Sequence, residues 1–514
     1  MMLREQINKY KEFVGDFANG ITDSVEFKKH SSPMGVYEQK ESNTFMVRVR
    51  IPAGSISLDN LKNITNLADL HANGYIHFTT RQDIQFHDVN IQNITDIIEG
   101  LYDVNLITYG SGGNAARNVA CSPLSGVDPD EIFDVSEYAL KSSEYFLKDA
   151  SFFNLPRKYK VSFSNSPSDT ANATISDLGF VAKIENGNKG FEVYGAGGLG
   201  NSSCIAVKLA DFIPACEVLY YIEAMKRLLE AEGDRTNRNK ARIRFIMFRL
   251  GEDEFRSRYL EFVDKVKAEK DSTLNIAECS DEKYVINNVQ SENKLLIRQK
   301  NNNYSVYVHP LLGNITTKNL NKIISFIEDL DYSVSIFLTN TQGFMVRDLK
   351  FSNAEKLLLI ISKFTSVFNI DNSVTCVGSS VCKIGICKSQ DLLSAIIERF
   401  SSAESKIKLA LPVLFISGCK NSCGQHQKGE IGFSGKFIKT DQGIKEAYTV
   451  FLGGNIVAGN AKLGEAYGDV IATDIPEFLL ELAKFKSNYD YKNFNEFLSA
   501  KKEATILLVN KYVN

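Results

Sequence analysis

Four cysteines in the last third of the chain have the residue type and spacing to bind an iron–sulfur cluster. They occur as Cys376-x5-Cys382 and Cys419-x3-Cys423, with 36 residues between the two pairs. A [4Fe–4S] cluster is held by four cysteine thiolates, and glycine and serine beside each pair let backbone N–H groups approach the sulfurs. The four thiols therefore predict a [4Fe–4S] cluster.

Two other interpretations of these cysteines explain less. Structural zinc sites usually use C-x2-4-C pairs, so the C-x5-C pair is long for zinc, and His426 is the only nearby histidine. Buried structural cysteines would not explain four thiols in two tight loops beside Gly and Ser. The other five cysteines lie outside the pattern, and we interpret them as core or incidental residues: Cys121, Cys204, Cys216, Cys279 and Cys387.

The sequence around the four cysteines resembles the siroheme and iron–sulfur sulfite and nitrite reductases, over residues 36–500. Residues 417–433, SGCKNSCGQHQKGEIGF, resemble the family's second cysteine loop and the strand after it, although proline is usual where Lys420 stands. The resemblance implies a siroheme as well as the cluster, with the Cys423 sulfur joining a cluster iron to the siroheme iron. It implies that the cluster ligands are Cys376, Cys382, Cys419 and Cys423.

Basic side chains are prominent in the first half of the chain, where the four cysteines are absent. Siroheme carries eight carboxylates and the substrate is an oxyanion, so both need cations and hydrogen-bond donors. The family pattern implies that the substrate is bound by Arg48, Arg117, Lys158 and Lys160. It implies that siroheme is bound by Thr79, Arg81, Gln85, His87 and Arg157, together with Cys423. No role is assigned to His77, Lys208 or His426.

Internal similarity at an offset of 260 residues predicts a duplicated chain. The paired segments, in order, are 45–52 with 306–310, 74–88 with 335–348, 119–121 with 374–376, and 177–180 with 430–433. Arg48 aligns with Tyr307 and Arg81 with Thr341, so these charges belong to one copy, whereas all four cluster cysteines belong to the other. We therefore expect one centre between the halves.

The fold class we expect is α+β / α/β with a pseudo-twofold duplication, in which each copy has a ferredoxin-like module and a larger α/β module. Strands are expected near 44–51 and 75–78, and a helix over 58–71. The expected parts are an N-terminal arm (1–35), ferredoxin-like module (36–110), siroheme-binding module (111–265), linker (266–295), second ferredoxin-like module (296–368) and cluster- and siroheme-binding module (369–514). We call 36–265 copy 1 and 296–514 copy 2.

Composition narrows the class of protein. The chain has 514 residues, 44% of them hydrophobic and 24% charged, with a net charge of −3, so there is no basic field for nucleic acid. No apolar run is long enough for a membrane span, and the charged start does not resemble a signal peptide. Nine cysteines without an export signal argue against disulfides. We expect a cytoplasmic protein.

The resemblance implies six-electron reduction of an oxyanion, with electrons from a separate ferredoxin or flavoprotein. The glycine run 195–200 lacks the acidic residue that a dinucleotide site would have about 20 positions on, and we interpret it as close packing near the cofactor. Lys158-x-Lys160 resembles sulfite reductases, whereas Asn421–Gln425 resembles nitrite-reducing members. We expect sulfite reduction to sulfide, with nitrite reduction to ammonium as the alternative. A non-catalytic iron–sulfur protein would need the cysteines but not the cations.

Overall fold

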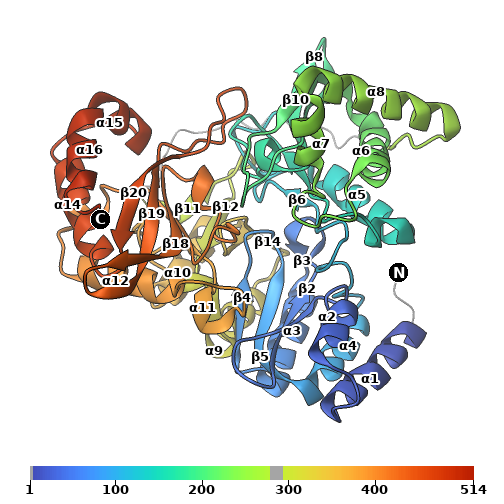
Figure 1. Ribbon diagram of the computed structural model, residues 1–514, viewed down its shortest axis with the longest axis horizontal. Coiled ribbons are helices and arrows are strands. Elements are labelled where there is room, and N and C mark those ends of the chain that lie inside the picture. Colours follow the sequence, from blue (N-terminus) through green and yellow to red (C-terminus); the bar gives the residue numbers. More distant parts are fainter. Residues whose placement is uncertain (1–3, 278–292, 514) are drawn as a thin grey trace.

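The computed structural model describes residues 4–277 and 293–513 (Figure 1). The described strands form four sheets of five strands each. Two sheets are small and antiparallel, and two are larger and mixed. In Figure 1 the first half of the chain, blue to green, lies on one side and the last quarter, orange to red, on the other.

The two small sheets exchange a strand. The first has the order β1 (Val36–Glu38), β2 (Thr44–Val49), β5 (Ile84–Asn90), β4 (Tyr75–Phe78) and β13 (Asn314–Thr316). The second has the order β11 (Leu296–Arg298), β12 (Tyr304–Val308), β15 (Phe344–Leu349), β14 (Ser335–Leu338) and β3 (Ser55–Ile56). Strand β13 of copy 2 thus completes the sheet of copy 1, and β3 of copy 1 completes the sheet of copy 2.

The two large sheets also have matching strand orders. In copy 1 the order is β6 (Ala120–Cys121), β7 (Val161–Ser164), β8 (Leu178–Glu185), β9 (Asn188–Gly195) and β10 (Val207–Pro214). In copy 2 it is β16 (Val374–Thr375), β17 (Leu414–Ser417), β18 (Ile431–Thr440), β19 (Gly443–Leu452) and β20 (Glu465–Ile471). In each sheet two parallel pairings are followed by two antiparallel ones.

Helices pack against each sheet. The N-terminal region and the small sheets carry α1 (Arg4–Ala18), α2 (Ser24–Ser31), α3 (Leu58–His71), α4 (Ile94–Tyr102), α9 (Thr317–Glu328) and α10 (Phe351–Ile361). Copy 1 adds α5 (Ser136–Lys148), α6 (Val218–Glu232), α7 (Ile243–Leu250) and α8 (Glu252–Glu269). Copy 2 adds α11 (Gly378–Val381), α12 (Ser389–Ser401), α13 (Ser405–Lys408), α14 (Ile475–Ser487), α15 (Phe494–Ala500) and α16 (Lys502–Asn510).

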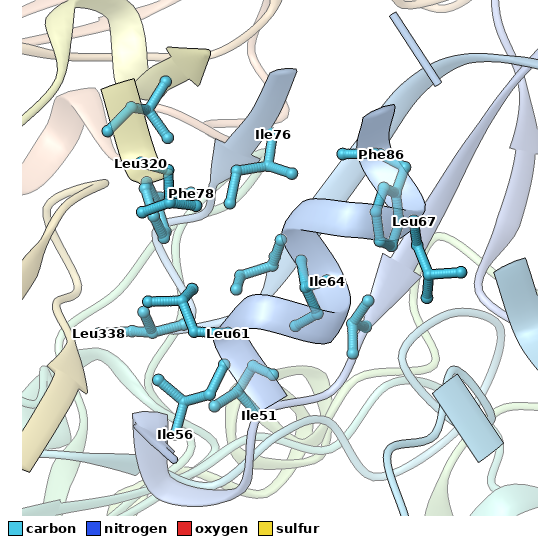
Figure 2. Close-up of a cluster of buried hydrophobic side chains, with 14 of the residues drawn as sticks. Ile51, Ile56, Leu61, Ile64, Leu67, Ile76, Phe78, Phe86, Leu320 and Leu338 are labelled. Carbon is cyan, nitrogen blue, oxygen red and sulfur yellow. The ribbon is translucent and has the colours of Figure 1, made fainter. Parts of the chain in front are cut away.

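One hydrophobic core serves both small sheets. Leu61, Ile64 and Leu67 of α3 recur at helical spacing and belong to this core, and Figure 2 shows Leu61 near Leu338 of copy 2 and Leu67 near Phe86 of copy 1. Fully burying one such side chain stabilises the fold by about 1.5–3 kcal/mol. The two copies therefore share a core through their small modules.

The duplication is confirmed, but one of the aligned pairs is wrong by one residue. Ser162 of β7 pairs with Ala120, and its counterpart in β17, Phe415, pairs with Val374. Ala120 is therefore equivalent to Val374, so the counterpart of Cys376 is the residue after Cys121. The sequence alignment had placed Cys376 opposite Cys121 itself, because a cysteine follows two small or branched residues in both segments.

The structure describes most of the N-terminal arm but only part of the expected linker. Residues 4–31 form α1 and α2, and Ile7, Tyr10, Val14 and Phe27 are buried in the core of the small sheets. Helix α8 extends into the expected linker, while 278–292, with Cys279, lie outside the described residues. The domain bounds stay predictions. None of the described helices is long and apolar enough to cross a membrane.

Candidate active site

The four motif cysteines lie in two loops at one edge of the large sheet of copy 2. Cys376 directly follows β16, and Cys419 and Cys423 follow β17, which runs parallel to β16. Because parallel strands end at the same edge of a sheet, the two loops lie together. The short helix α11 then leads the chain to Cys382. Local chain geometry thus gathers all four thiols.

The four thiols are close enough to influence one another's protonation. Burial, and then the neighbouring Cys423 thiol, raise the pKa of Cys376 to about 11. Burial also raises the pKa values of Cys382 and Cys419, and Cys423 contributes to both increases. Cys423 is therefore an electrostatic neighbour of the other three. Thiols with raised pKa values are protonated until a metal displaces their protons.

The loops offer backbone donors to a sulfur and fit a cluster. The N–H of Gly418 donates to Cys376 Sγ (3.1 Å), and Ser389 Oγ lies 3.2 Å from the same sulfur. A Cβ at Gly424 would lie 2.0 Å from the Ile416 carbonyl oxygen, so only glycine fits beside Cys423. Within 4–277 and 293–513 no three Cys, His, Asp or Glu side chains are placed to hold one metal ion. Four thiolates around a cube of several irons is a different arrangement, and this donor set fits it.

Two buried lysines of copy 1 have perturbed pKa values, and one of them is influenced by a cysteine of copy 2. Burial, followed by the charges of Arg242 and Arg117, lowers the pKa of Lys158 to about 7, while the Cys423 thiol acts in the opposite direction. Burial and the charge of Lys158 lower the pKa of Lys160 well below its ordinary value. Lys158 and Cys423, from opposite halves of the chain, are therefore within electrostatic range of each other.

Arg48 and Arg117 bind the same loop, residues 110–113. Arg48 Nη1 donates to the Ser111 carbonyl oxygen (3.0 Å). Arg117 Nη1 donates to the Gly112 carbonyl oxygen (2.5 Å), and its Nη2 donates to that of Gly113 (2.6 Å). Burial lowers the pKa of Arg117 to about 9, and the charge of Arg48 adds to the decrease. The two guanidinium groups are thus fixed next to each other.

A chain of hydrogen bonds links Arg48 to His87 through strand β5. The Gln85 amide satisfies both neighbours when its oxygen accepts from Arg48 Nη2 (2.7 Å) and Nε (3.0 Å) and its nitrogen donates to His87 Nε2 (3.2 Å). The His87 proton is then on Nδ1, which is buried and has no hydrogen-bond partner in the described part of the chain. An unpaired buried donor is unfavourable, and a siroheme carboxylate would pair with it.

The turn at residues 79–83, before β5, forms hydrogen bonds with both copies of the repeat. Thr79 Oγ1 accepts from the Arg81 N–H (3.2 Å) and the Asp83 N–H (3.0 Å). Thr80 Oγ1 donates to the Cys423 carbonyl oxygen (3.1 Å). The Arg81 guanidinium donates to three acceptors on β7 and the segment before β6, namely the carbonyl oxygens of Asn118 and Val161 and Ser162 Oγ. Arg81 therefore uses three of its five N–H donors within the protein.

Arg157, Lys208 and His426 lie in three different environments. Arg157 Nη1 donates to Asn114 Oδ1 (3.4 Å), and burial and nearby arginines lower its pKa. Lys208 forms a surface ion pair with Glu192 (3.0 Å). His426 is buried beside Phe451, with 5.0 Å between ring centroids. We call the group of candidate substrate residues the cation site; it consists of Arg48, Arg117, Lys158 and Lys160. Among the described residues, neither Lys208 nor His426 is seen to contact it.

His77 joins the two copies. Its Nδ1 lies 2.7 Å from Asn314 Oδ1 and its Nε2 lies 3.2 Å from Gln342 Nε2, so both ring nitrogens are occupied within the protein. Gln342 in turn exchanges hydrogen bonds with the backbone of Thr375, the residue before Cys376. Burial lowers the pKa of His77 to about 4. The ring is therefore neutral at physiological pH and has a positioning role.

Sequence reasoning missed two arginines at the start of α7. Arg242 forms a buried ion pair with Asp177 (2.6 Å), and its charge acts on Lys158 and Lys160. Arg244 donates to the carbonyl oxygens of Leu199 (3.2 Å) and Asn201 (2.7 Å), which holds the glycine-rich loop. The only signal was the basic run 235–244, which has the composition of a solvated surface segment.

The glycine-rich loop contacts the cysteine-bearing half. The N–H and C=O of Gly200 each bond the Gln427 side-chain amide at 3.1 Å. A Cβ at Gly200 would lie 3.3 Å from the Asn421 carbonyl oxygen, next to the Cys419–Cys423 turn. The interpretation of this loop as a close-packing segment is confirmed, and the loop helps to close the site from the side of copy 1.

The site holds more positive than negative charge. Its basic side chains are Arg48, Arg50, Arg81, Arg117, Lys158, Lys160 and Arg242, and the carboxylates that act on them are Asp83 and Asp177. Buried like charges are unfavourable unless an anion joins them. A polyanionic cofactor and an anionic substrate would supply that charge, so these residues fit siroheme with an oxyanion.

Comparisons with known proteins agree with this arrangement. Residues 37–104 match the model of the nitrite/sulfite reductase ferredoxin-like half domain, and residues 112–266 match that of the nitrite and sulphite reductase 4Fe-4S domain. The chain is 28% identical to the ferredoxin–nitrite reductase of Synechococcus elongatus, over 85% of each chain. It is 25% identical to sulfite reductase [ferredoxin] 1 of Mycolicibacterium paratuberculosis, over 81% of this chain and 74% of the relative.

A solved structure shows the same fold. The NirA protein of Mycobacterium tuberculosis superposes with a TM-score of 0.80 over 94% of this chain and 92% of that one, at 22% identity. The matched 4Fe-4S domain implies siroheme and a [4Fe–4S] cluster as cofactors. Residues 37–266 therefore carry two domains of the nitrite and sulfite reductase family, and the chain is similar to nitrite and sulfite reductases over most of its length.

Proposed function

We propose that this chain catalyses the six-electron reduction of sulfite to sulfide. The observation that carries the proposal is the position of Lys158, a buried lysine of copy 1 on whose pKa the Cys423 thiol of copy 2 acts, with Lys160 two residues away. Sulfite approaches two negative charges near neutral pH, whereas nitrite carries one. Two lysines and two arginines around one position favour the more highly charged anion.

The cations have different duties in this proposal. Arg48 and Arg117 orient the anion, because the 110–113 loop and Gln85 hold their guanidinium groups in place. Lys158, with its pKa near 7, gives up and regains a proton at physiological pH, so it supplies protons to the oxygens that leave as water while the sulfur is reduced. Bound siroheme and the adjoining cluster supply the electrons and the open iron position.

The electron donor we propose is ferredoxin. The two relatives named above are a ferredoxin–nitrite reductase and a ferredoxin sulfite reductase. A flavoprotein donor is the alternative, and reduced flavoprotein in place of reduced ferredoxin distinguishes them in a turnover assay.

Nitrite is the second candidate substrate. Most of the similar curated proteins are named nitrite reductases, and the segment Asn421–Gln425 resembles nitrite-reducing members. A non-catalytic electron-transfer role has less support, because it leaves the buried cations around Lys158 without a use. The choice between the two anions therefore depends on turnover.

The test is a spectrum followed by kinetics on the purified holoenzyme. A Soret band and a band at the red end of the visible spectrum are expected, which a bare cluster would lack. With reduced methyl viologen as donor, kcat/KM is expected to be higher for sulfite than for nitrite. The reverse order would assign nitrite as the substrate, and absence of the Soret band would favour an electron-transfer protein.

A further inference from the structure

A cavity of about 1000 Å³ lies away from the cation site, between the two copies. Its wall includes Tyr307, Asn340, Thr341 and Met345 of the second small module and Thr170 of copy 1. This volume is at the upper end of the range that small-molecule and cofactor sites usually have. None of the residues to which the sequence or the family gives a role lines it.

Strand register identifies this cavity as the pseudo-twofold counterpart of the candidate active site. Tyr307 pairs with Met345 across β12 and β15, as Arg48 pairs with Gln85 across β2 and β5. The turns that follow are equivalent as well, because Gln342 has a φ of 65° and its counterpart Gln82 has a φ of 56°. The cavity is thus built by the same elements of the repeat as the cation site.

A shared contact extends the equivalence to the cysteine loop. Thr80 Oγ1 donates to the Cys423 carbonyl oxygen at 3.1 Å, and its counterpart Asn340 donates through Nδ2 to the Thr170 carbonyl oxygen at 3.1 Å. The residues two positions further on, Gln425 and Asn172, both have positive φ and precede a 3-10 turn. Thr170 therefore occupies the position of the bridging cysteine, and it cannot ligate a cluster.

The wall of this cavity has neutral side chains at positions where the candidate active site has basic ones. Tyr307 replaces Arg48, Thr341 replaces Arg81, and Val413 replaces Lys160. Lys428 is present, but its Nζ donates to Asn172 Oδ1 (2.8 Å), and Glu430 and Asp128 also line the cavity. An octacarboxylate would meet no group of cations here, so the cavity is unsuited to siroheme.

One buried polar atom points to what the cavity accepts. The Asn340 side chain is 3% exposed and lines the cavity, and its Oδ1 has no hydrogen-bond partner among the described residues. An amide oxygen accepts hydrogen bonds, so a ligand would have to supply an N–H or O–H. Met345, Val413 and Phe415 supply apolar surface around it.

We propose that this cavity is a second ligand site, which binds an uncharged, largely apolar compound through an N–H or O–H donated to Asn340 Oδ1. The ligand takes no part in oxyanion reduction, because no cysteine lines the cavity and its one basic side chain, Lys428, is hydrogen-bonded to Asn172. The duplication thus supplies one redox site and one neutral-ligand site from the same set of strands.

The experiment uses the holoenzyme and lumichrome, an uncharged tricyclic heterocycle with N–H donors, in equilibrium dialysis at pH 7. One lumichrome per chain is expected to bind. Asn340→Leu removes the unpaired oxygen and is expected to raise Kd about tenfold, the size of one lost buried hydrogen bond. The matched control is Asn369→Leu, because Asn369 lines the same cavity and donates to the Leu411 carbonyl oxygen, and Kd is expected to change by about twofold or less.

A competition experiment and a second variant test the same cavity independently. Uroporphyrin, an octacarboxylate like siroheme, is expected not to displace lumichrome. If Asn340→Leu fails to fold, Val457→Trp from the exposed part of the cavity wall is expected to block binding instead. Absence of lumichrome binding, equal effects of the two Asn→Leu changes, or displacement by uroporphyrin would each overturn the proposal. The siroheme spectrum is a separate readout, so these results do not depend on the substrate assignment.

Discussion

Arg242 and Asp177 form a buried, two-pronged ion pair, with Nη2 to Oδ2 at 2.6 Å and Nε to Oδ1 at 3.1 Å. The same Asp177 Oδ2 accepts a hydrogen bond from the Lys160 N–H at 3.0 Å. One carboxylate therefore fixes both the backbone of a proposed substrate lysine and the arginine beside it. The pair explains how a segment rich in like charges keeps a single conformation.

Asp177→Asn is predicted to destabilise the protein strongly. The change leaves the charge of Arg242 buried without its partner, which typically costs about 3–5 kcal/mol. Thermal unfolding of the holoprotein measures the effect. The control is Lys208→Ala, which breaks a more exposed ion pair with Glu192 and is expected to cost about 1 kcal/mol or less. Equal decreases in Tm would contradict a special role for Asp177.

The parts of the fold that follow from local sequence were predictable. The helix expected over 58–71 is confirmed with the same bounds, because Ser57 Oγ caps it by accepting from the Asn60 N–H and apolar residues recur at helical spacing. The strand expected over 75–78 is also confirmed. The exchange of β3 and β13 was not predictable, because strands of two or three residues have no periodicity to detect.

Site residues that belong to a sequence motif were predictable. Site residues that only tertiary packing brings together were not. The four cysteines could be found because two loops concentrate them. Arg242 could not be found, since only the folded chain brings α7 against Asp177, 65 residues earlier. The cysteine alignment slipped by one residue because Ala120–Cys121 and Val374–Thr375 are two-residue strands whose register only hydrogen bonds reveal.

Lys160→Asn is predicted to lower kcat/KM for sulfite more than for nitrite. Although burial lowers the pKa of Lys160, a bound anion favours its charged form, and removing such a charged hydrogen-bond donor costs about 1.5–3 kcal/mol, or about tenfold to a hundredfold in rate. Nitrite, with one charge, should lose less. Steady-state assays with both anions and one artificial donor measure the ratio, and Lys160→Arg, which keeps the charge, is the control. Equal losses for the two anions would remove the reason for preferring sulfite.

Cys376→Ser is predicted to abolish cluster assembly, whereas Cys387→Ser is not. Cys376 belongs to the four-cysteine motif and its pKa is raised by the neighbouring Cys423 thiol, and a serine hydroxyl is a poor replacement for a thiolate iron ligand. Cys387 is equally close in sequence, but its thiol donates to the Lys436 carbonyl oxygen (3.3 Å) in the core. Iron and acid-labile sulfide are measured on purified protein. Loss of both from Cys387→Ser, with retention in Cys376→Ser, would show that the ligand set is different.

Lys428→Met is predicted to flatten the pH dependence of stability between pH 7 and pH 10. Burial lowers the pKa of Lys428 to about 7, whereas an unfolded lysine titrates near 10.5. Between these values the unfolded chain binds one more proton than the folded chain, so Lys428 makes stability rise with pH, by at most about 1.4 kcal/mol per pH unit. Methionine keeps most of the volume and removes the titration. The midpoint of urea unfolding at pH 7, 8 and 9 measures the slope, with Lys420→Met, an exposed lysine, as the control. A wild-type slope that survives in Lys428→Met would mean that the amine is charged and solvated in the folded protein.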